Sequence, residues 1–146
     1  MYKYHQSHIY NPQKDTYRGY MKPKNVQDLT HIGFFLIPQF SMLSMSAAVE
    51  PLRIANRLSQ RDLYEWSFYS KHSLPVRASN GIEVASTRLM EDTTGLDALI
   101  VVAGIDVKDH DDPILSHWLR GLSRRSITLG STSTGTILLA QAKLLQ

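Results

Sequence analysis

The sequence contains no cysteine, which excludes a disulfide bond, a thiolate metal site and a cysteine nucleophile. It also lacks any apolar run near the roughly 18 residues that a membrane-spanning helix needs. The stretch 1–30 is polar and rich in tyrosine, so it has no apolar segment of the kind found in a secretory signal. We therefore expect a cytoplasmic protein without a membrane partner.

The excess of basic over acidic residues lies in the first thirty residues. The chain has 16 Lys and Arg residues, of which five lie in 1–30, and 13 Asp and Glu residues, of which two lie in 1–30. Residues 31–146 therefore hold 11 charges of each sign. Binding to the phosphate backbone of DNA depends on clustered Lys and Arg. The charges predict a flexible basic tail over 1–30 and a neutral domain over 31–146 that does not itself bind DNA.

Hydrophobic patterning predicts alternating strands and helices. Continuous apolar runs at 31–38 and 96–103 are typical of strands that are buried on both faces of a parallel sheet. Shorter strands are expected at 63–70 and 126–131, and Asn80-Gly81 indicates a hairpin turn within 74–86. Helices are expected at 39–60, after Pro113 and at 134–146.

The predicted helix over 39–60 contains Pro51, so it is either kinked there or begins only shortly before it. Strands that alternate with helices imply parallel pairing and right-handed crossovers. The fold class expected is α/β, with a doubly wound, mostly parallel sheet and helices on both faces. The chain stops in or just after its last helix, so we expect a C-terminally truncated domain.

Ligands in an open α/β sheet bind at the carboxyl ends of the strands. Three such ends are visible, at 38–41, at Ala103-Gly104 and at 131–135. The last is a degenerate relative of the G-x-S-x-G turn, in which a sharp strand-to-helix connection lifts the Ser133 side chain clear of the sheet. Gly135 would let the following helix pack close to the strand.

Five ordered blocks of the chain resemble a known family. They include "EPLRIANRL", "LDALIVVAGI" and "LGSTSTGTILLAQAKLL", and the match runs from about residue 31 to residue 146. They are similar to the N-terminal domain of GlxA-type AraC-family transcription regulators, which belongs to the ThiJ/PfpI, glutamine-amidotransferase-like superfamily with its flavodoxin-like sheet. The resemblance implies a homodimer, a small amine or amino-acid derivative as inducer, and DNA binding only through a helix-turn-helix region absent from this chain.

The same resemblance assigns roles to four residues. Ser133, followed by Thr134, stands where the superfamily enzymes carry a cysteine nucleophile, Ser44 stands where many carry a carboxylate, and Gly104 remains from a Gly-Gly pair that supplies an oxyanion-hole amide. A serine hydroxyl needs a positioned base, and the histidines of this chain come from segments not expected at this end. We therefore expect a ligand-binding site of Ser133, Thr134, Ser44 and Gly104, without catalysis, cofactor or metal.

Three other interpretations stay open. The chain could be a ThiJ/PfpI-type hydrolase or amidotransferase-like enzyme that uses Ser133. Ser133 and Thr134 could simply cap the last helix, as Ser and Thr often do. The chain could also be a truncated product without independent activity. If the ligand-site interpretation holds, Ser133 should be partly buried at the floor of a cleft.

Overall fold

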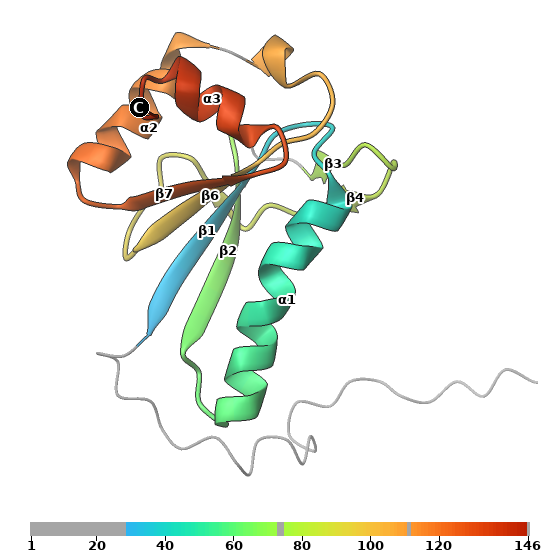
Figure 1. The fold of residues 1–146 in the computed structure, drawn as a ribbon, viewed down its shortest axis with the longest axis vertical. Helices are drawn as coiled ribbons and strands as arrows, with labels where there is room; N and C mark the ends of the chain where they lie inside the picture. Colours follow the sequence, from blue (N-terminus) through green and yellow to red (C-terminus); the bar gives the residue numbers. More distant parts are fainter. Residues whose placement is uncertain (1–28, 73–74, 111, 146) are drawn as a thin grey trace, which may run out of the picture.

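A computed structural model of the chain describes residues 29–72, 75–110 and 112–145 (Figure 1). Five strands form one sheet in the order β5-β2-β1-β6-β7, and every neighbouring pair is parallel. The strands are β1 (Thr30–Leu36), β2 (Tyr64–Ser70), β5 (Arg88–Leu89), β6 (Ala98–Val102) and β7 (Thr128–Thr132). The expected parallel sheet is confirmed, whereas most of the expected basic tail, 1–30, lies outside the described residues.

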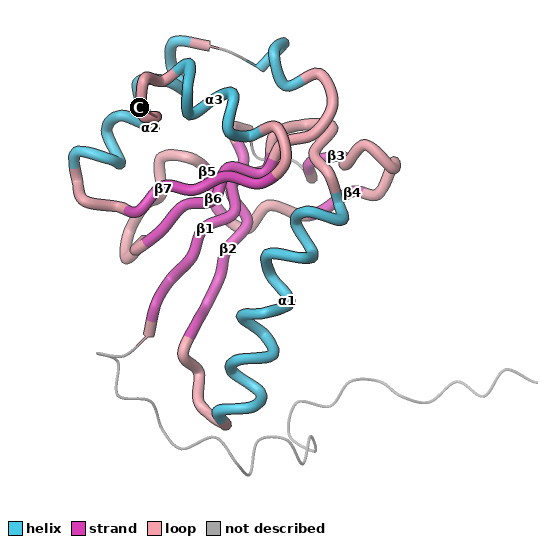
Figure 2. Tube along the Cα trace, in the orientation of Figure 1, coloured by secondary structure: helices cyan, strands magenta, loops and turns pink. Residues whose placement is uncertain are grey.

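Helices cover both faces of the sheet, as a doubly wound domain requires (Figures 1 and 2). One face carries α1 (Met42–Ser59), and the other carries α2 (Pro113–Arg124) and α3 (Gly135–Gln141). Phe34 pairs in register with Phe68 and Ile100 and faces the α1 layer, whereas Phe35 faces the α2 and α3 layer. Because successive strand residues alternate between faces, the apolar run of β1 fills both cores.

Local signals in the sequence explain where the helices begin. The Ser41 side chain caps α1 by accepting a hydrogen bond from the Ser44 amide at 3.2 Å, and Asp112 caps α2 by accepting one from the Leu115 amide at 2.8 Å. Pro51 lies well inside α1, which continues to Ser59. The expectation that this helix begins shortly before Pro51 is therefore wrong, because the Ser41 cap and the apolar face start it earlier.

The predicted hairpin is also present. Strands β3 (Val76–Arg77) and β4 (Glu83–Val84) pair antiparallel, and Gly81 has the positive φ of 88° that favours glycine. The hairpin docks on the loop after β1: the Gln39 amide donates to the Arg77 carbonyl at 2.8 Å, and the Ser79 amide donates to the Phe40 carbonyl at 3.0 Å. This contact brings Ser79 to the carboxyl end of the sheet.

Several element bounds differ from those expected. The last helix ends at Gln141 rather than continuing to 146, and the chain turns back at Lys143, whose φ is 59°. Neither β5 nor the 3-10 helix η3 (Val107–His110) was expected, because two or four residues are too few to show a hydrophobic period. Among the described residues, no helix is long and apolar enough to cross a membrane.

Candidate functional site

The carboxyl ends of β1, β6 and β7 meet around a groove of about 630 Å³, which we call the elbow groove. The loops after these strands and the tip of the hairpin form it (Figure 2). The lining residues are Ser41, Ser79, Gly104, Ile105, Asp106, Val107, Lys108, Asp109, Ser133 and Thr134. Its position follows the general rule for ligand sites in open α/β sheets.

Ser133 stands on a sharp turn between β7 and α3. Its φ is 53°, in the left-handed region that non-glycine residues rarely adopt. Gly135 makes the turn possible, because a Cβ at this position would lie 2.4 Å from the Val101 carbonyl oxygen of β6. The close packing predicted for Gly135 is confirmed, and the strand-turn-helix geometry of a nucleophile elbow is retained.

Gly104 brings the loop after β6 against the loop after β1. A Cβ here would lie 2.2 Å from the Gln39 carbonyl oxygen, and the Ser41 amide donates to the Ala103 carbonyl at 3.1 Å. From the opposite side, the Thr134 hydroxyl donates to the Gly104 carbonyl at 2.5 Å. These contacts tie the three strand-end loops together, two through backbone atoms alone and one through the Thr134 hydroxyl.

The structure brings Ser133, Thr134 and Gly104 to the elbow groove, but Ser44 is not among its lining residues. Ser44 lies in the first turn of α1, where its hydroxyl donates to the Ser41 carbonyl at 3.0 Å and lies 3.3 Å from the Thr132 hydroxyl. Ser41 lines the groove at this end instead.

Two expectations about the elbow are wrong. Ser133 is exposed rather than partly buried at a cleft floor, because the positive φ turns it away from the sheet. The interpretation of these residues as helix caps also fails. Thr134 occupies the N-cap position of α3 but makes no capping hydrogen bond with its side chain, and its hydroxyl bonds to Gly104 instead.

Sequence reasoning missed Ser79 and the charged side chains of the groove. Asp106, Lys108 and Asp109 follow β6 directly, so the rule that ligands bind at strand ends could have included them. Ser79 carried no such signal, because only the docking of the hairpin on Phe40 brings it to the groove.

The groove offers hydroxyl groups and side chains of both charges. No histidine is among its described lining residues, and within the described part of the chain no base is hydrogen-bonded to the Ser133 hydroxyl. The described residues also contain no group of His, Asp and Glu that could hold a metal ion. Such a surface suits a small polar ligand that binds through hydrogen bonds and charge.

A comparison with curated proteins relates the chain to bacterial regulators, although no family model matches it. It is 46% identical over 112 residues to the HTH-type transcriptional regulator CdhR of Pseudomonas aeruginosa. The aligned region covers 77% of this chain and 33% of CdhR. It is 37% identical over 123 residues to the HTH-type transcriptional regulator GlxA of Rhizobium meliloti, and this aligned region covers 84% of this chain and 37% of that protein. The chain is a relative of the GlxA-type transcription regulators. It spans about a third of the length of these curated relatives.

Solved structures agree with this relationship to the GlxA-type regulators. An AraC family transcriptional regulator from Pseudomonas putida superposes with a TM-score of 0.72 at 27% identity, over 78% of this chain and 71% of that one. A ThiJ/PfpI family protein from Pseudomonas syringae superposes with a TM-score of 0.64 at 18% identity, over 97% of this chain and 54% of that one. At this identity the match supports the fold alone. The resemblance and the fold class inferred from the sequence are confirmed.

Proposed function

We propose that the chain carries the small-molecule-sensing domain of an AraC-family transcription regulator and that this domain is not an enzyme. The observation that carries the proposal is that Ser133, and not a cysteine, stands at the tip of the elbow in this ThiJ/PfpI-like fold. The chain is at the same time similar to a GlxA-type regulator. A cysteine at this point becomes a thiolate without help, whereas a serine needs a base. The geometry of the nucleophile site is kept while its chemistry is lost.

The ligand we propose is a small amine or amino-acid derivative bound in the elbow groove. The hydroxyl groups of Ser41, Ser79 and Ser133 can accept or donate hydrogen bonds, Asp106 or Asp109 can pair with an amine, and Lys108 can pair with a carboxylate. A volume of about 630 Å³ is within the range of small-molecule sites.

Three of the six non-glycine residues with a positive φ in the described part of the chain lie in the loops that form the same groove. Gln39, Asp106 and Ser133 each have a positive φ, of 62°, 58° and 53° respectively, and each belongs to a different one of the three strand-end loops. Such residues cost on the order of 1–3 kcal/mol each and often occur where a ligand is held. Their convergence at one end of the sheet supports a binding role for the loops.

We propose that the full regulator binds DNA through a helix-turn-helix region outside this chain. We also propose that it works in the cytoplasm as a homodimer. The neutral charge of 31–146 gives this domain no basic surface for DNA. Ligand would then act by binding one conformation of the dimer more tightly than another, which shifts the population toward it.

A thermal-shift screen of the chain against the standard amino acids and their N-methylated derivatives tests the proposal. At least one compound should raise the midpoint of unfolding, and the Ser133→Phe variant should lose that shift because the ring fills the groove. Ser123→Phe, the same change at an exposed position of α2, is the control and should keep it. A stabilising compound that acts equally on both variants would contradict binding in the elbow groove.

A hydrolase or amidotransferase-like enzyme is the second candidate, favoured by the exposed Ser133 at a strained elbow. We expect no turnover of ester or amide substrates, because the hydroxyl lacks a hydrogen-bonded base within the described residues. Turnover by the purified chain that Ser133→Ala abolishes would favour the enzyme.

A further inference from the structure

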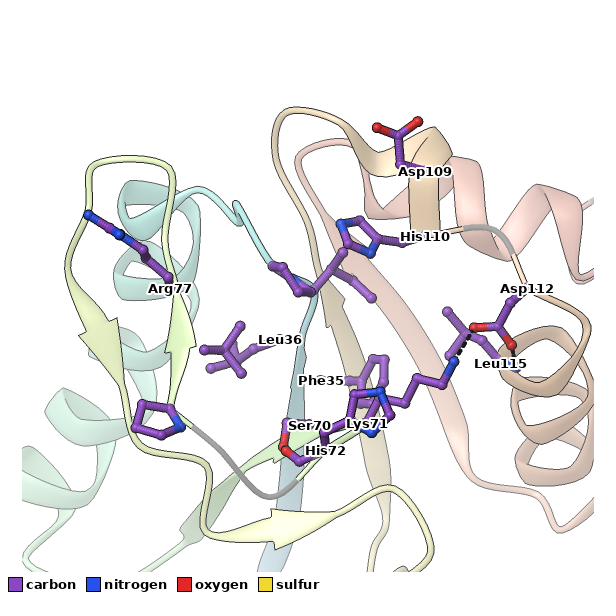
Figure 3. Close-up of a pocket in the computed structure, with 14 residues that line it drawn as sticks. Phe35, Leu36, Ser70, Lys71, His72, Arg77, Asp109, His110, Asp112 and Leu115 are labelled. Carbon is purple, nitrogen blue, oxygen red and sulfur yellow. Dashed lines mark hydrogen bonds and ion pairs between the residues drawn. The ribbon is translucent and has the colours of Figure 1, made fainter.

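A second cavity of about 600 Å³ lies at the carboxyl ends of β1 and β2 (Figure 3). The ends of these strands, the hairpin strand β3, and residues of η3 and of the start of α2 line it. We call it the Lys71 cavity. Of the described residues that line it, only Asp109 also lines the elbow groove, so the two cavities have almost entirely different walls.

The wall of the Lys71 cavity is apolar and rigid. Phe35, Leu36, Val76 and Leu115 line it, and each is less than a tenth exposed because it belongs to one of the two cores. Side chains fixed in this way give a preformed surface that suits the hydrocarbon part of a small ligand.

One ammonium group is held at the edge of this wall. The Lys71 Nζ donates to Asp112 Oδ2 at 2.7 Å, while Asp112 Oδ1 accepts from the Leu115 amide. Both carboxylate oxygens of Asp112 are therefore occupied, whereas a lysine ammonium has three donors and this pair uses one of them. Lys71 is oriented by its partner and keeps donors for a second acceptor.

The backbone beside Lys71 is also fixed. Ser70 is only 2% exposed, its hydroxyl donates to the His72 carbonyl, and it is hydrogen-bonded to the Ser86 hydroxyl at 2.9 Å. These bonds clamp the turn at the end of β2 on both sides of Lys71. The lysine therefore projects from a supported position rather than from a free loop.

The other polar groups around the cavity are two imidazole rings and a guanidinium. His72 and His110 line it, whereas the guanidinium of Arg77, on the hairpin, points away from Leu36 and Lys71 (Figure 3). The His110 ring points toward the labelled side chains of the cavity, whereas the Asp109 carboxylate points away from them. The ion pair of Lys71 and Asp112 carries no net charge, and the donors that its ammonium keeps favour an acceptor such as a carboxylate.

We infer that the Lys71 cavity binds a small carboxylate with an apolar tail, with the carboxylate on Lys71 and the tail against Phe35, Leu36 and Leu115. This site does not depend on the ligand proposed for the elbow groove. It adds a second, chemically distinct input to the domain.

Titration of the chain with 4-methylvalerate, followed by calorimetry, tests this inference. The carboxylate should bind, while the uncharged 4-methylvaleramide should bind at least about tenfold more weakly, since a hydrogen bond to a charged group is lost. Lys71→Met should weaken carboxylate binding by a similar factor, and Lys71→Arg should restore most of it. Lys143→Met, at an exposed position beyond α3, is the matched control and should leave binding unchanged.

Histidine ring signals in the NMR spectrum locate the site without any substitution. Carboxylate should move the signals of His72 or His110, and leave those of His31, buried in β1, and His117, exposed on α2. Ser133→Phe should not change the affinity. The inference would be overturned if the carboxylate did not bind, if the amide bound equally well, or if 3-methylbutylamine bound more strongly. Shifts confined to His31 or His117 would also overturn it.

Discussion

Gly104 decides how closely the loops of the elbow groove approach one another. The Gln39 carbonyl oxygen occupies the space in which any other residue would carry its Cβ, 2.2 Å away, and the Thr134 hydroxyl holds the Gly104 carbonyl from the other side. The close approach of the loop after β6 to the loop after β1 thus depends on the absence of one methyl group. This is a tighter constraint than the hydrogen-bonding role that the sequence suggested for this glycine.

Gly104→Ala should therefore destabilise the domain by about 2–3 kcal/mol or more, because backbone atoms rather than a flexible side chain must move. Gly121→Ala is the matched control, since a Cβ there has no neighbour within 4 Å. In the middle of α2 it should stabilise by roughly 0.5–1 kcal/mol. Urea unfolding of both variants measures this, and equal effects would contradict the close-approach account.

Elements were easier to predict than residues. The long strands and the three helices followed from the hydrophobic period, because each is long enough to bury a regular apolar face. The short hairpin followed instead from its turn residues, Asn80-Gly81. β5 and η3 were too short to show a period, yet η3 supplies Asp109 to both cavities. Ser41 belongs to the strand end 38–41 that the sequence indicated, whereas Ser79 could not be assigned to the groove by pattern, since only packing of the hairpin brings it there.

The start of α2 depends on a single carboxylate with two partners. Asp112 caps the helix and pairs with Lys71, and the hydrogen bond from Lys71 is the main cause that lowers the pKa of Asp112 below its ordinary 3.8. A lowered pKa in the folded state stabilises the fold above the unfolded value, and this stabilisation is lost as the pH falls through the folded value.

Asp112→Asn keeps a good capping residue but removes the charge. At pH 7 it should destabilise by less than about 1 kcal/mol, because the Lys71 side chain is 37% exposed and the pair is screened by solvent. The difference from the unaltered chain should shrink as the pH falls below 3.8. Urea unfolding at several pH values measures this, with Lys71→Met expected to behave alike. A difference that does not change with pH would contradict the role of the ion pair.

At the scale of the whole molecule, charge and fold support the proposed division between sensing by this domain and DNA binding elsewhere. Residues 31–146 hold 11 charges of each sign, and the described elements form one doubly wound sheet without a helix-turn-helix pair. The fold class and the relationship to GlxA-type regulators could be predicted from the sequence because ordered blocks carry both. The ligand could not, because the groove's charged residues come from a segment without a pattern.

The chain alone should not bind promoter DNA specifically. Its only excess of positive charge lies in 1–30, and binding that rests on such charge weakens steeply with salt. A mobility-shift titration at physiological salt should show no sequence-specific complex. A salt-resistant complex that prefers one promoter sequence would contradict the separation of the two roles.

The central claim is that a ligand binds where the three strand-end loops converge. Amide hydrogen exchange of the chain, with and without the compound that most raises its unfolding midpoint, tests this most directly. The account predicts that the compound slows exchange together in 39–41, 104–109 and 133–135, because a ligand in the elbow groove must contact and order all three loops. Protection confined to other segments, with these three unchanged, would contradict it.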